Sequence, residues 1–345
     1  MVKQIFRSKA PLRLGLGGGG TDVSPYADLY GGAVLNATIN LFTYATVETT
    51  EKETISFHAA ERNEYCELPL AYPLPLDGDL LLHKGIYNRI VRDFRGGRPF
   101  PLRLTTHSDA PAGSGLGTSS TLVVAIVNAY KELLNLPLGE YEIARLAFDI
   151  ERRDLGMSGG RQDQYAATFG GVNFMEFYAS DRVIVNPLRI KSSVLHELNY
   201  NLLLYHMGTS RLSSSIISHQ IESVEAGERE TIAAMDQVKE QAVLMKEAML
   251  TGRLEDIGRI LDFGWQNKKK MAVEISNPHI DEMYEKAKTH GAIGGKVSGA
   301  GGGGFLMLYV DGERRFDVME ALAPYGGRFV DYQFYGHGVE GWRVR

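Results

Sequence analysis

The apolar positions of this chain follow two periods, which separate the predicted helices from the predicted strands. Apolar residues repeated every three and four positions are typical of an amphipathic helix, whereas alternating or continuous apolar residues favour a strand. The helical repeat occurs in residues 79–94, 122–134, 139–154, 278–290 and 313–322. Strand patterns occur in residues 33–49, 102–106, 172–177, 183–187, 201–206, 305–310 and 328–335.

A long helical stretch with interspersed Lys and Glu, residues 212–273, lies between two sections that mix helices and strands. A shorter helix is predicted over residues 161–169, because a glycine pair follows it and glycine commonly ends helices. With 345 residues, the chain is long enough to form two domains. We therefore predict an α+β protein with domains at residues 1–192 and 193–345.

A glycine-rich loop followed by a helical repeat is the strongest chemical signal in the chain. It reads P-A-G-S-G-L-G-T-S-S-T-L from Pro111 to Leu122. Glycines let the backbone approach a ligand closely, and the N-terminus of the following helix presents N–H groups and a positive dipole end to an anion. A flexible turn before a helix is the alternative interpretation. As a phosphate-binding loop, the segment offers Pro111, Gly113, Ser114, Gly115, Leu116, Gly117, Thr118, Ser119 and Ser120.

Two more glycine-rich segments occur, at residues 15–22 and 298–304. Both contain G-x-G-x-x-G, which indicates a dinucleotide site only where a helix follows the loop and an acidic residue lies about 20 positions on. The first segment has Asn40 at that position, and the second leads into a predicted strand. A P-loop does not fit either, because Val297 stands where Ser or Thr should follow the Gly-Lys pair.

Composition narrows the class of protein further. Hydrophobic residues make up 44% and charged residues 23% of the chain, as in an ordinary globular protein, and the net charge is only −5. Since no basic block is present, nucleic acid is not an expected partner. No apolar run approaches the ~18 residues of a membrane span, and residues 1–9 lack an apolar signal segment, so a membrane is not expected as a partner. The single Cys66 fits a cytoplasmic location.

Several charged residues have two interpretations on sequence grounds alone. Asp163 follows a glycine pair near a predicted helix start, which suits a catalytic carboxylate or one stabilised by the helix dipole. Glu151 belongs to a Glu-Arg-Arg-Asp run that is otherwise a solvated helix face. Arg211 lies in a serine-rich segment able to bind an anion or to cap a helix. The run Lys268-Lys269-Lys270 is expected to be a solvated helix end.

The order of the three glycine-rich segments resembles that of the GHMP kinases, a family that includes galactokinases, homoserine kinases and mevalonate kinases. The similarity covers residues 10–309, and the middle segment follows the specific family motif P-x-G-x-G-L-G-S-S with one extra Thr. Within the family, residues 10–32 look most like the bacterial D-glycero-D-manno-heptose 7-phosphate kinases. The resemblance implies two α+β domains with the active site in the cleft between them.

The resemblance also implies catalytic roles. The middle loop would hold the triphosphate of ATP, and Ser119 and Glu151 would hold Mg²⁺, with Ser120 or Thr118 as alternatives to Ser119. Asp163, twelve residues after Glu151, would accept or orient the proton of the acceptor hydroxyl. Arg13 stands where the family has a basic residue beside this aspartate, and it would favour the charged form of the carboxylate and neutralise the moving phosphoryl group.

A third group of residues is implied to bind the sugar. Asp22 matches the aspartate that binds sugar hydroxyls in galactokinases, although it also suits the N-cap of a helix over residues 23–30. Gly19 and Gly20 replace a Glu-His pair of those enzymes. The missing side chains predict room for a bulkier or phosphorylated sugar.

The function implied by the resemblance is phosphorylation of the anomeric hydroxyl of a heptose 7-phosphate, for nucleotide-activated heptose and surface polysaccharide. Arg161 or Arg211 is expected to bind the substrate phosphate. The late loop, Gly299 to Gly304, is expected to close the site against the nucleotide and the sugar, with Gly301 and Gly302 binding the substrate. Another sugar 1-kinase, of fucose or galactose type, is one alternative. A catalytically silent regulator that binds ATP or sugar is another, although such a protein need not retain the catalytic residues.

Overall fold

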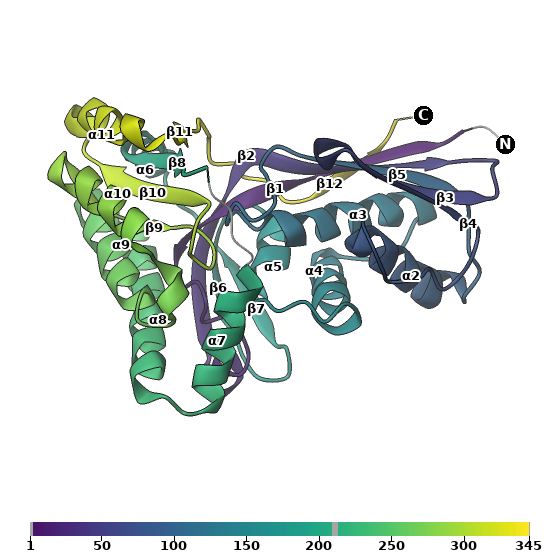
Figure 1. Cartoon of the computed structure of the whole chain (residues 1–345), viewed down its shortest axis with the longest axis horizontal. Coiled ribbons are helices and arrows are strands. Elements are labelled where there is room, and N and C mark those ends of the chain that lie inside the picture. The colour runs from purple at the N-terminus through teal and green to yellow at the C-terminus, as the bar shows by residue number, and fades with distance from the viewer. Residues whose placement is uncertain (1–2, 209–212, 345) are drawn as a thin grey trace.

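The computed structural model describes residues 3–208 and 213–344, which form two α+β halves lying side by side (Figure 1). The strands are β1 (Ile5–Gly17), β2 (Gly32–Thr49), β3 (Thr54–Ala59), β4 (Glu64–Pro69), β5 (Leu102–Ser108), β6 (Val172–Phe177), β7 (Val183–Pro187), β8 (Leu202–His206), β9 (Ala292–Val297), β10 (Phe305–Val310), β11 (Arg328–Phe329) and β12 (Glu340–Arg343). The helices are α1 (Tyr26–Tyr30), α2 (Leu81–Arg95), α3 (Thr118–Leu134), α4 (Glu140–Asp149), α5 (Gln162–Phe169), α6 (Ser192–Asn201), α7 (Ser213–Glu225), α8 (Arg229–Thr251), α9 (Leu254–Lys268), α10 (Pro278–Thr289) and α11 (Arg315–Leu322). The predicted α+β class is confirmed.

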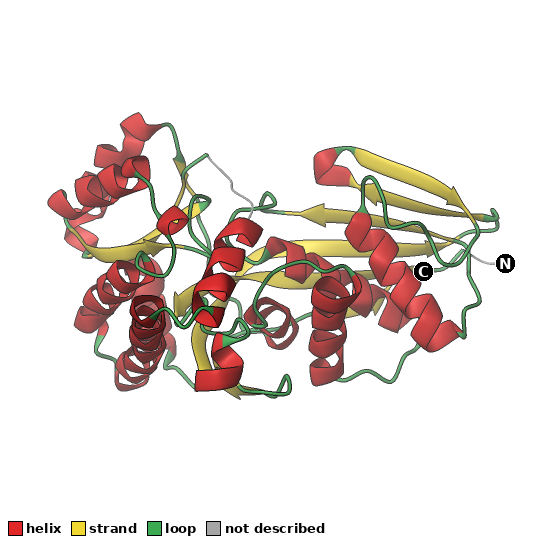
Figure 2. Ribbon diagram, turned by 60° about the horizontal axis from the view of Figure 1, so that its bottom comes forward, coloured by secondary structure: helices red, strands yellow, loops and turns green. Residues whose placement is uncertain are grey.

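Each half is built around one sheet. The first sheet has the order β12-β1-β2-β5-β3-β4, and β6 and β7 extend it along the other part of β2. Neighbouring strands in this sheet are antiparallel, except β3 and β5, which run parallel to each other. The second sheet has the antiparallel order β11-β8-β10-β9. Helices α3 and α5 pack on the first sheet, and α9 and α10 pack on the second (Figures 1 and 2).

The two longest strands, β1 and β2, run antiparallel between the outer end of the first sheet and the middle of the molecule (Figure 1). β2 pairs with β5 through residues 43–49 and with β6 through residues 32–37. β1 pairs with β2, and the register of this pairing shifts between Pro11 and Arg13 and between Gly15 and Gly17. The end of β1 therefore places Arg13 and the first glycine-rich segment where the two halves meet.

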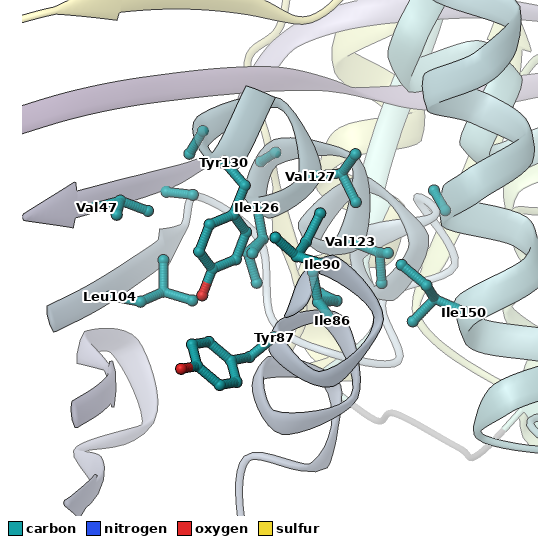
Figure 3. Close-up of a cluster of buried hydrophobic side chains, with 14 of the residues drawn as sticks. Val47, Ile86, Tyr87, Ile90, Leu104, Val123, Ile126, Val127, Tyr130 and Ile150 are labelled. Atoms are coloured by element: carbon teal, nitrogen blue, oxygen red, sulfur yellow. The ribbon is translucent and has the colours of Figure 1, made fainter. Parts of the chain in front are cut away.

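The core of the first half fixes helix α3 on the sheet (Figure 3). Four apolar residues of α3 are fully buried at the helical spacing of three and four, namely Val123, Ile126, Val127 and Tyr130. They pack with Val47 of β2, Leu104 of β5 and residues of α2 in one cluster. Burying an aliphatic side chain of this size stabilises the fold by about 1.5–3 kcal/mol. The core thus holds the helix whose N-terminus follows the middle glycine loop.

A second apolar cluster joins the two halves. It contains Leu14 and Leu35 from the first sheet together with Leu204, Leu261 and Met307 from the second half. The chain also returns to the first sheet at its end, since β12 pairs with the start of β1. The two halves are therefore joined by a continuous apolar core rather than by a flexible linker. A domain boundary at residue 192, the first residue of α6, stays a prediction.

Some predicted elements differ from the structure. The hairpin of β3 and β4, helix α6 and strands β9 and β12 were not expected. In β9 the pattern is interrupted by glycines because α9 packs closely there: a Cβ on Gly294 would lie 1.9 Å from the carbonyl oxygen of Gly258. Of the strand predicted over residues 328–335, only β11 forms, because the chain then leaves the second sheet and Phe334 bridges to Ile39 of β2.

Candidate active site

A cavity of about 750 Å³ is lined by residues from both halves of the molecule. All three glycine-rich segments contribute to it, through Gly20, through Gly113, Gly115 and Gly117, and through Gly299. The first and last of these glycines, Gly20 and Gly299, are 279 residues apart in the chain. The predicted active site in the cleft between the halves is therefore present as a cavity, and the tertiary structure brings the three loops together there.

The middle loop packs against the late segment. Gly115 has φ +81°, and a Cβ there would lie 2.5 Å from the carbonyl oxygen of Ser298, so only glycine fits. The hydroxyl of Ser298 donates to the carbonyl of Gly115 at 2.8 Å. Helix α3 begins at Thr118, with the hydroxyls of Ser114 and Thr118 3.0 Å apart. The hydroxyl residues after the loop thus form the first turn of the helix.

Not every residue of the middle loop faces the cavity. Gly113, Gly115, Gly117, Thr118, Ser119 and Ser120 line it. Pro111, Ser114 and Leu116 are absent from the lining, and Leu116 is fully buried in the apolar cluster that joins the halves. For these three residues the structure supports a role in shaping the loop.

Asp163, the second residue of α5, is held by Arg13. Its Oδ1 accepts a hydrogen bond from Nε of Arg13 at 2.7 Å and forms an ion pair with Nη2 at 2.7 Å, while Nη1 donates to the carbonyl of Gly115 at 2.6 Å. The loop approaches the same carboxylate, because a Cβ on Gly117 would lie 3.1 Å from Cγ of Asp163. Within the described residues, Oδ2 of Asp163 has no hydrogen bond. One carboxylate oxygen is therefore available beside the loop.

Ser119 and Glu151 form a second polar group in the cavity. The hydroxyl of Ser119 donates to Oε1 of Glu151 at 3.1 Å, and the amide of Gln164 donates to Oε2 at 2.5 Å. Glu151 lies in a π-helical turn, Ile150–Asp154, that continues α4, and it is only 1% exposed. Among the described residues there is no group of three His, Cys, Asp or Glu side chains suited to a metal. A hydroxyl with one carboxylate is the partial set of hard oxygen ligands that Mg²⁺ takes beside phosphates.

Asp22 lies in the cavity but does not cap a helix. Helix α1 begins at Tyr26, later than expected. The carboxylate of Asp22 instead accepts hydrogen bonds from the backbone N–H and the side-chain amide of Gln162, both at 3.0 Å, and from the N–H of Gly20 at 3.2 Å. These three donors fix the orientation of a carboxylate that is 1% exposed.

The structure does not bring Arg161 into the cavity. This side chain is buried, and its guanidinium donates to the carbonyl of Tyr178 at 2.8 Å, to the hydroxyl of Ser24 at 2.6 Å and to Asp28 at 2.5 Å. It therefore ties α1 to the hairpin of β6 and β7, which argues against binding of a substrate phosphate. The other candidate, Arg211, lies outside the described residues.

The late segment contributes Gly299 and Ala300 to the cavity rather than Gly301 and Gly302. The N–H of Gly302 donates to the carbonyl of Ile275 at 2.8 Å, and a Cβ on Gly301 would lie 2.7 Å from the same oxygen. Gly301 is required because the loop packs against the turn at Ile275, and Gly302 has φ +75°, which favours glycine. The predicted substrate contact of Gly301 and Gly302 therefore lacks support from the cavity lining, although Gly299 brings the late loop to the cavity.

Residues of the second half occupy the space beside Gly19 and Gly20, which was expected to be open. A Cβ on Gly20 would lie 2.9 Å from Cε of Met271, and one on Gly19 would lie 3.8 Å from Nζ of Lys268. Lys268 was expected to be solvated, but it is 3% exposed and lines the cavity. Sequence reasoning missed it because a lysine run at a helix end is usually exposed, and no local signal marks one member as buried.

Further lining residues were also missed. Arg152, beside Glu151, lies over the loop before α5, with Nε 3.4 Å from the carbonyl oxygen of Gly160. Ser214, Ile217 and Gln220 line the cavity from α7. Another part of the lining comes from the start of α2 and the turn before β4 and includes His83, whose pKa burial lowers to about 3. No helix within the described residues is long and apolar enough to cross a membrane.

Comparison with known proteins agrees with this geometry. Residues 82–171 match the GHMP kinases N terminal domain, and residues 245–325 match the GHMP kinases C terminal domain. A D-glycero-alpha-D-manno-heptose 7-phosphate kinase of Campylobacter jejuni is 46% identical over 99% of this chain and 100% of its own.

Solved structures give the same result. A D-glycero-D-manno-heptose 1-phosphate kinase from Bacteroides thetaiotaomicron has a TM-score of 0.83 and 45% identity over 99% of both chains. A Lactococcus lactis galactokinase complexed with galactose, at 19% identity, has the same fold with a TM-score of 0.76 over 97% of this chain and 95% of its own. Family membership implies ATP as the phosphoryl donor. With its three loops and the Asp163–Arg13 pair in one cavity, this chain belongs to the GHMP kinases and is a sugar kinase.

Proposed function

We propose that this protein transfers the γ-phosphoryl group of Mg·ATP to the anomeric (C1) hydroxyl of a heptose 7-phosphate and forms the 1,7-bisphosphate. The observation that carries the proposal is the position of Asp163, which is bound by Arg13 and lies against Gly117 of the middle loop. A carboxylate beside a phosphate-binding loop suits proton acceptance from an acceptor hydroxyl. The 46% identical heptose 7-phosphate kinase of Campylobacter jejuni supports heptose as the sugar.

The proposed reaction uses the two oxygens of Asp163 differently. Oδ1 is bound to Arg13, which fixes the orientation of the carboxylate. Oδ2 accepts the proton of the sugar hydroxyl as that oxygen forms its bond to the γ-phosphorus. The bond between the γ-phosphorus and the bridging oxygen of ADP breaks, and ADP leaves. Positioning and charge neutralisation are the main contributions of a protein to phosphoryl transfer.

The middle loop and the N-terminus of α3 would bind the triphosphate, because free N–H groups and the helix dipole favour an anion there. Ser119 and Glu151 would hold Mg²⁺, whose bound charge neutralises the β- and γ-phosphates. The nucleoside would occupy the part of the cavity lined by Arg62, Leu80 and His83. His83 is neutral there, since its pKa is lowered to about 3.

Asp22 would bind hydroxyls of the sugar. Its carboxylate is fixed by Gln162 and Gly20, so it can accept sugar hydrogen bonds without losing its orientation. The phosphate of the substrate requires a cation, and Arg161 is engaged elsewhere. Arg211 stays the sequence-based candidate for this contact.

Product analysis tests the site of phosphorylation. The Bacteroides structure is named for a heptose 1-phosphate, and a sugar already phosphorylated at C1 cannot accept a second group there. With heptose 7-phosphate and ATP we expect one new ³¹P signal coupled to the anomeric proton. A parallel preparation from the same host without this protein serves as the control, since any product it forms would reveal a contaminating kinase. Phosphorylation at another carbon would contradict the proposal.

Substrate preference tests the sugar. We expect kcat/KM for heptose 7-phosphate to exceed that for galactose at least ~100-fold, because one or two charged hydrogen bonds to phosphate contribute about 1.5–3 kcal/mol each. Arg211→Ala should remove much of this preference. Equal use of both sugars, or preference for an unphosphorylated sugar, would refute the assignment of the substrate while leaving the kinase family unchanged.

A further inference from the structure

Lys268, the last residue of α9, is a buried cation in the wall of the cavity. It is 3% exposed, and its ammonium donates a hydrogen bond to the carbonyl of Gly299. The cavity lining contains it together with Arg13, Asp22 and Asp163. The reaction described above gives this residue no role.

The peptide that binds Lys268 packs directly on the middle loop. A Cβ on Gly299 would lie 2.7 Å from Cα of Gly115, which is closer than van der Waals contact. Arg13 donates to the carbonyl of Gly115 at 2.6 Å. The two cations are thus held by the carbonyls of two glycines that touch each other, one from each half of the molecule.

The first glycine-rich segment lies on the other side of the Lys268 ammonium. A Cβ on Gly19 would lie 3.8 Å from Nζ of Lys268 and 3.9 Å from the amide nitrogen of Gln162. Gln162 in turn binds Asp22. The ammonium therefore lies between the loop that would hold the triphosphate and the carboxylate that would hold the sugar. In transfer from ATP to a sugar, the γ-phosphoryl group occupies this region.

The positive charge of Lys268 is only partly compensated by the groups around it. A buried cation loses hydration, and a carbonyl replaces only part of it. Asp163 is already paired with Arg13, and Asp22 is held by Gln162. Burial, followed by the charge of Arg13, lowers the pKa of Lys268 to about 8. An anion bound beside the ammonium would restore the missing compensation.

We propose that Lys268 is a further catalytic residue, which binds a non-bridging oxygen of the γ-phosphoryl group as that group moves from ATP to the sugar. This inference rests on the proposed function. The ammonium donates a hydrogen bond and neutralises charge, and it transfers no proton. The hydroxyl proton goes to Asp163, the new bond forms between the sugar oxygen and phosphorus, and ADP carries away the electron pair of the broken bond.

The first experiment needs no sugar. Calorimetry with Mg²⁺ compares the affinity of ADP with that of a non-hydrolysable ATP analogue. In Lys268→Gln we expect the analogue to lose at least ~10-fold in affinity and ADP to change less than ~2-fold, because only the analogue has a γ-phosphate. At pH 8 the wild-type protein should take up roughly half a proton on binding the analogue, and Lys268→Gln none. Lys270→Gln, an exposed position in the same run, is the matched control.

The second experiment measures turnover with whichever sugar the wild-type protein phosphorylates. Lys268→Gln should lower kcat at least ~100-fold and change the KM of the sugar less than ~3-fold, and Lys268→Arg should recover at least ~10-fold of the loss. If Lys268→Gln does not fold, Lys268→Met, which keeps the buried volume without a polar group, replaces it. The unfolding midpoint of each variant is measured alongside.

The outcomes separate this inference from the proposed function. Equal loss of ADP and analogue affinity would overturn the inference, and so would a loss confined to the KM of a phosphorylated sugar. The latter result would assign Lys268 to the sugar's own phosphate. If the wild-type protein phosphorylates no heptose but the analogue still requires Lys268, the proposed function fails and the inference stands.

Discussion

Gln162 donates two hydrogen bonds to the carboxylate of Asp22, one from its backbone and one from its side chain, both at 3.0 Å. Because the next residue is Asp163, the carboxylate that would bind the sugar and the carboxylate that would accept its proton are linked through one residue. Gly160 permits this contact, since a Cβ there would lie 1.9 Å from Oδ2 of Asp22. The start of α5 therefore sets the position of the acceptor relative to the base.

Gly160→Ala should therefore impair use of the sugar and spare ATP binding. The new methyl group displaces Asp22, and loss of a hydrogen bond to a charged group costs about 1.5–3 kcal/mol, which corresponds to a ~10–100-fold lower kcat/KM for the sugar. Steady-state kinetics with each substrate varied checks this. Gly336→Ala is the control, because its Cβ would meet no atom within 4 Å. A normal sugar KM and kcat in Gly160→Ala would contradict the link.

Asp163→Asn should abolish turnover while ATP still binds, because the amide keeps the shape but cannot accept the proton. General base catalysis contributes roughly 10²–10⁴-fold. Steady-state kinetics measures the turnover, and calorimetry measures the binding of ATP. The exposed Asp317→Asn is the matched control. Turnover within ~10-fold of wild type, about 1.4 kcal/mol of barrier, would rule out the base role.

Glu151→Gln should raise the Mg²⁺ concentration needed for half-maximal activity, since an amide is a weaker ligand for a hard cation than a carboxylate. The amide oxygen can keep the hydrogen bond from Ser119 at 3.1 Å, but the amide nitrogen then faces the Gln164 donor at 2.5 Å, so a modest fall in the unfolding midpoint is expected and is measured alongside. Activity is measured across a Mg²⁺ titration at constant ATP. An unchanged titration curve would remove Glu151 from the metal site.

Arg161→Ala should destabilise the protein and leave the KM for a phosphorylated sugar unchanged. The guanidinium is itself buried and has three hydrogen-bond partners that lose a charged donor, so we expect the free energy of unfolding to fall by about 2 kcal/mol. Urea unfolding and sugar kinetics below the unfolding range measure both quantities. A tenfold rise in KM at unchanged stability would return Arg161 to the substrate site.

Activity should fall as the pH rises through about 8. Lys268 carries its charge below its pKa of about 8 and loses it above. The alkaline limb of the pH profile of kcat/KM, which reports the free enzyme, should therefore decline above about pH 8. The charged groups that act on its ammonium are Arg13 and Asp22 from the first half of the chain, Asp163 from α5 and Lys296 from β9. Lys268→Arg should move the limb to higher pH, because arginine stays protonated. A limb that stays near pH 8 in this variant would belong to another group.

Local sequence determined many of the elements and the residue types they carry, although not the hairpin of β3 and β4, α6, β9 or β12. The spacing of Val123, Ile126 and Val127 predicts α3 and its buried face, because helical periodicity depends only on neighbours in the chain. The three glycine-rich segments and the carboxylates of Glu151 and Asp163 are visible for the same reason. The family resemblance added which of these residues act together.

Only the tertiary structure decided which charged side chains face the cavity. Lys268 and Arg161 are both buried, yet one lines the cavity and the other ties α1 to a hairpin. Asp22 binds Gln162, 140 residues away, instead of capping a helix. Such contacts depend on how closely distant segments approach, as where Gly294 of β9 packs against α9. No local sequence pattern records that distance. Burial and pairing of a charge are properties of packing, so they exist only once the two halves are assembled.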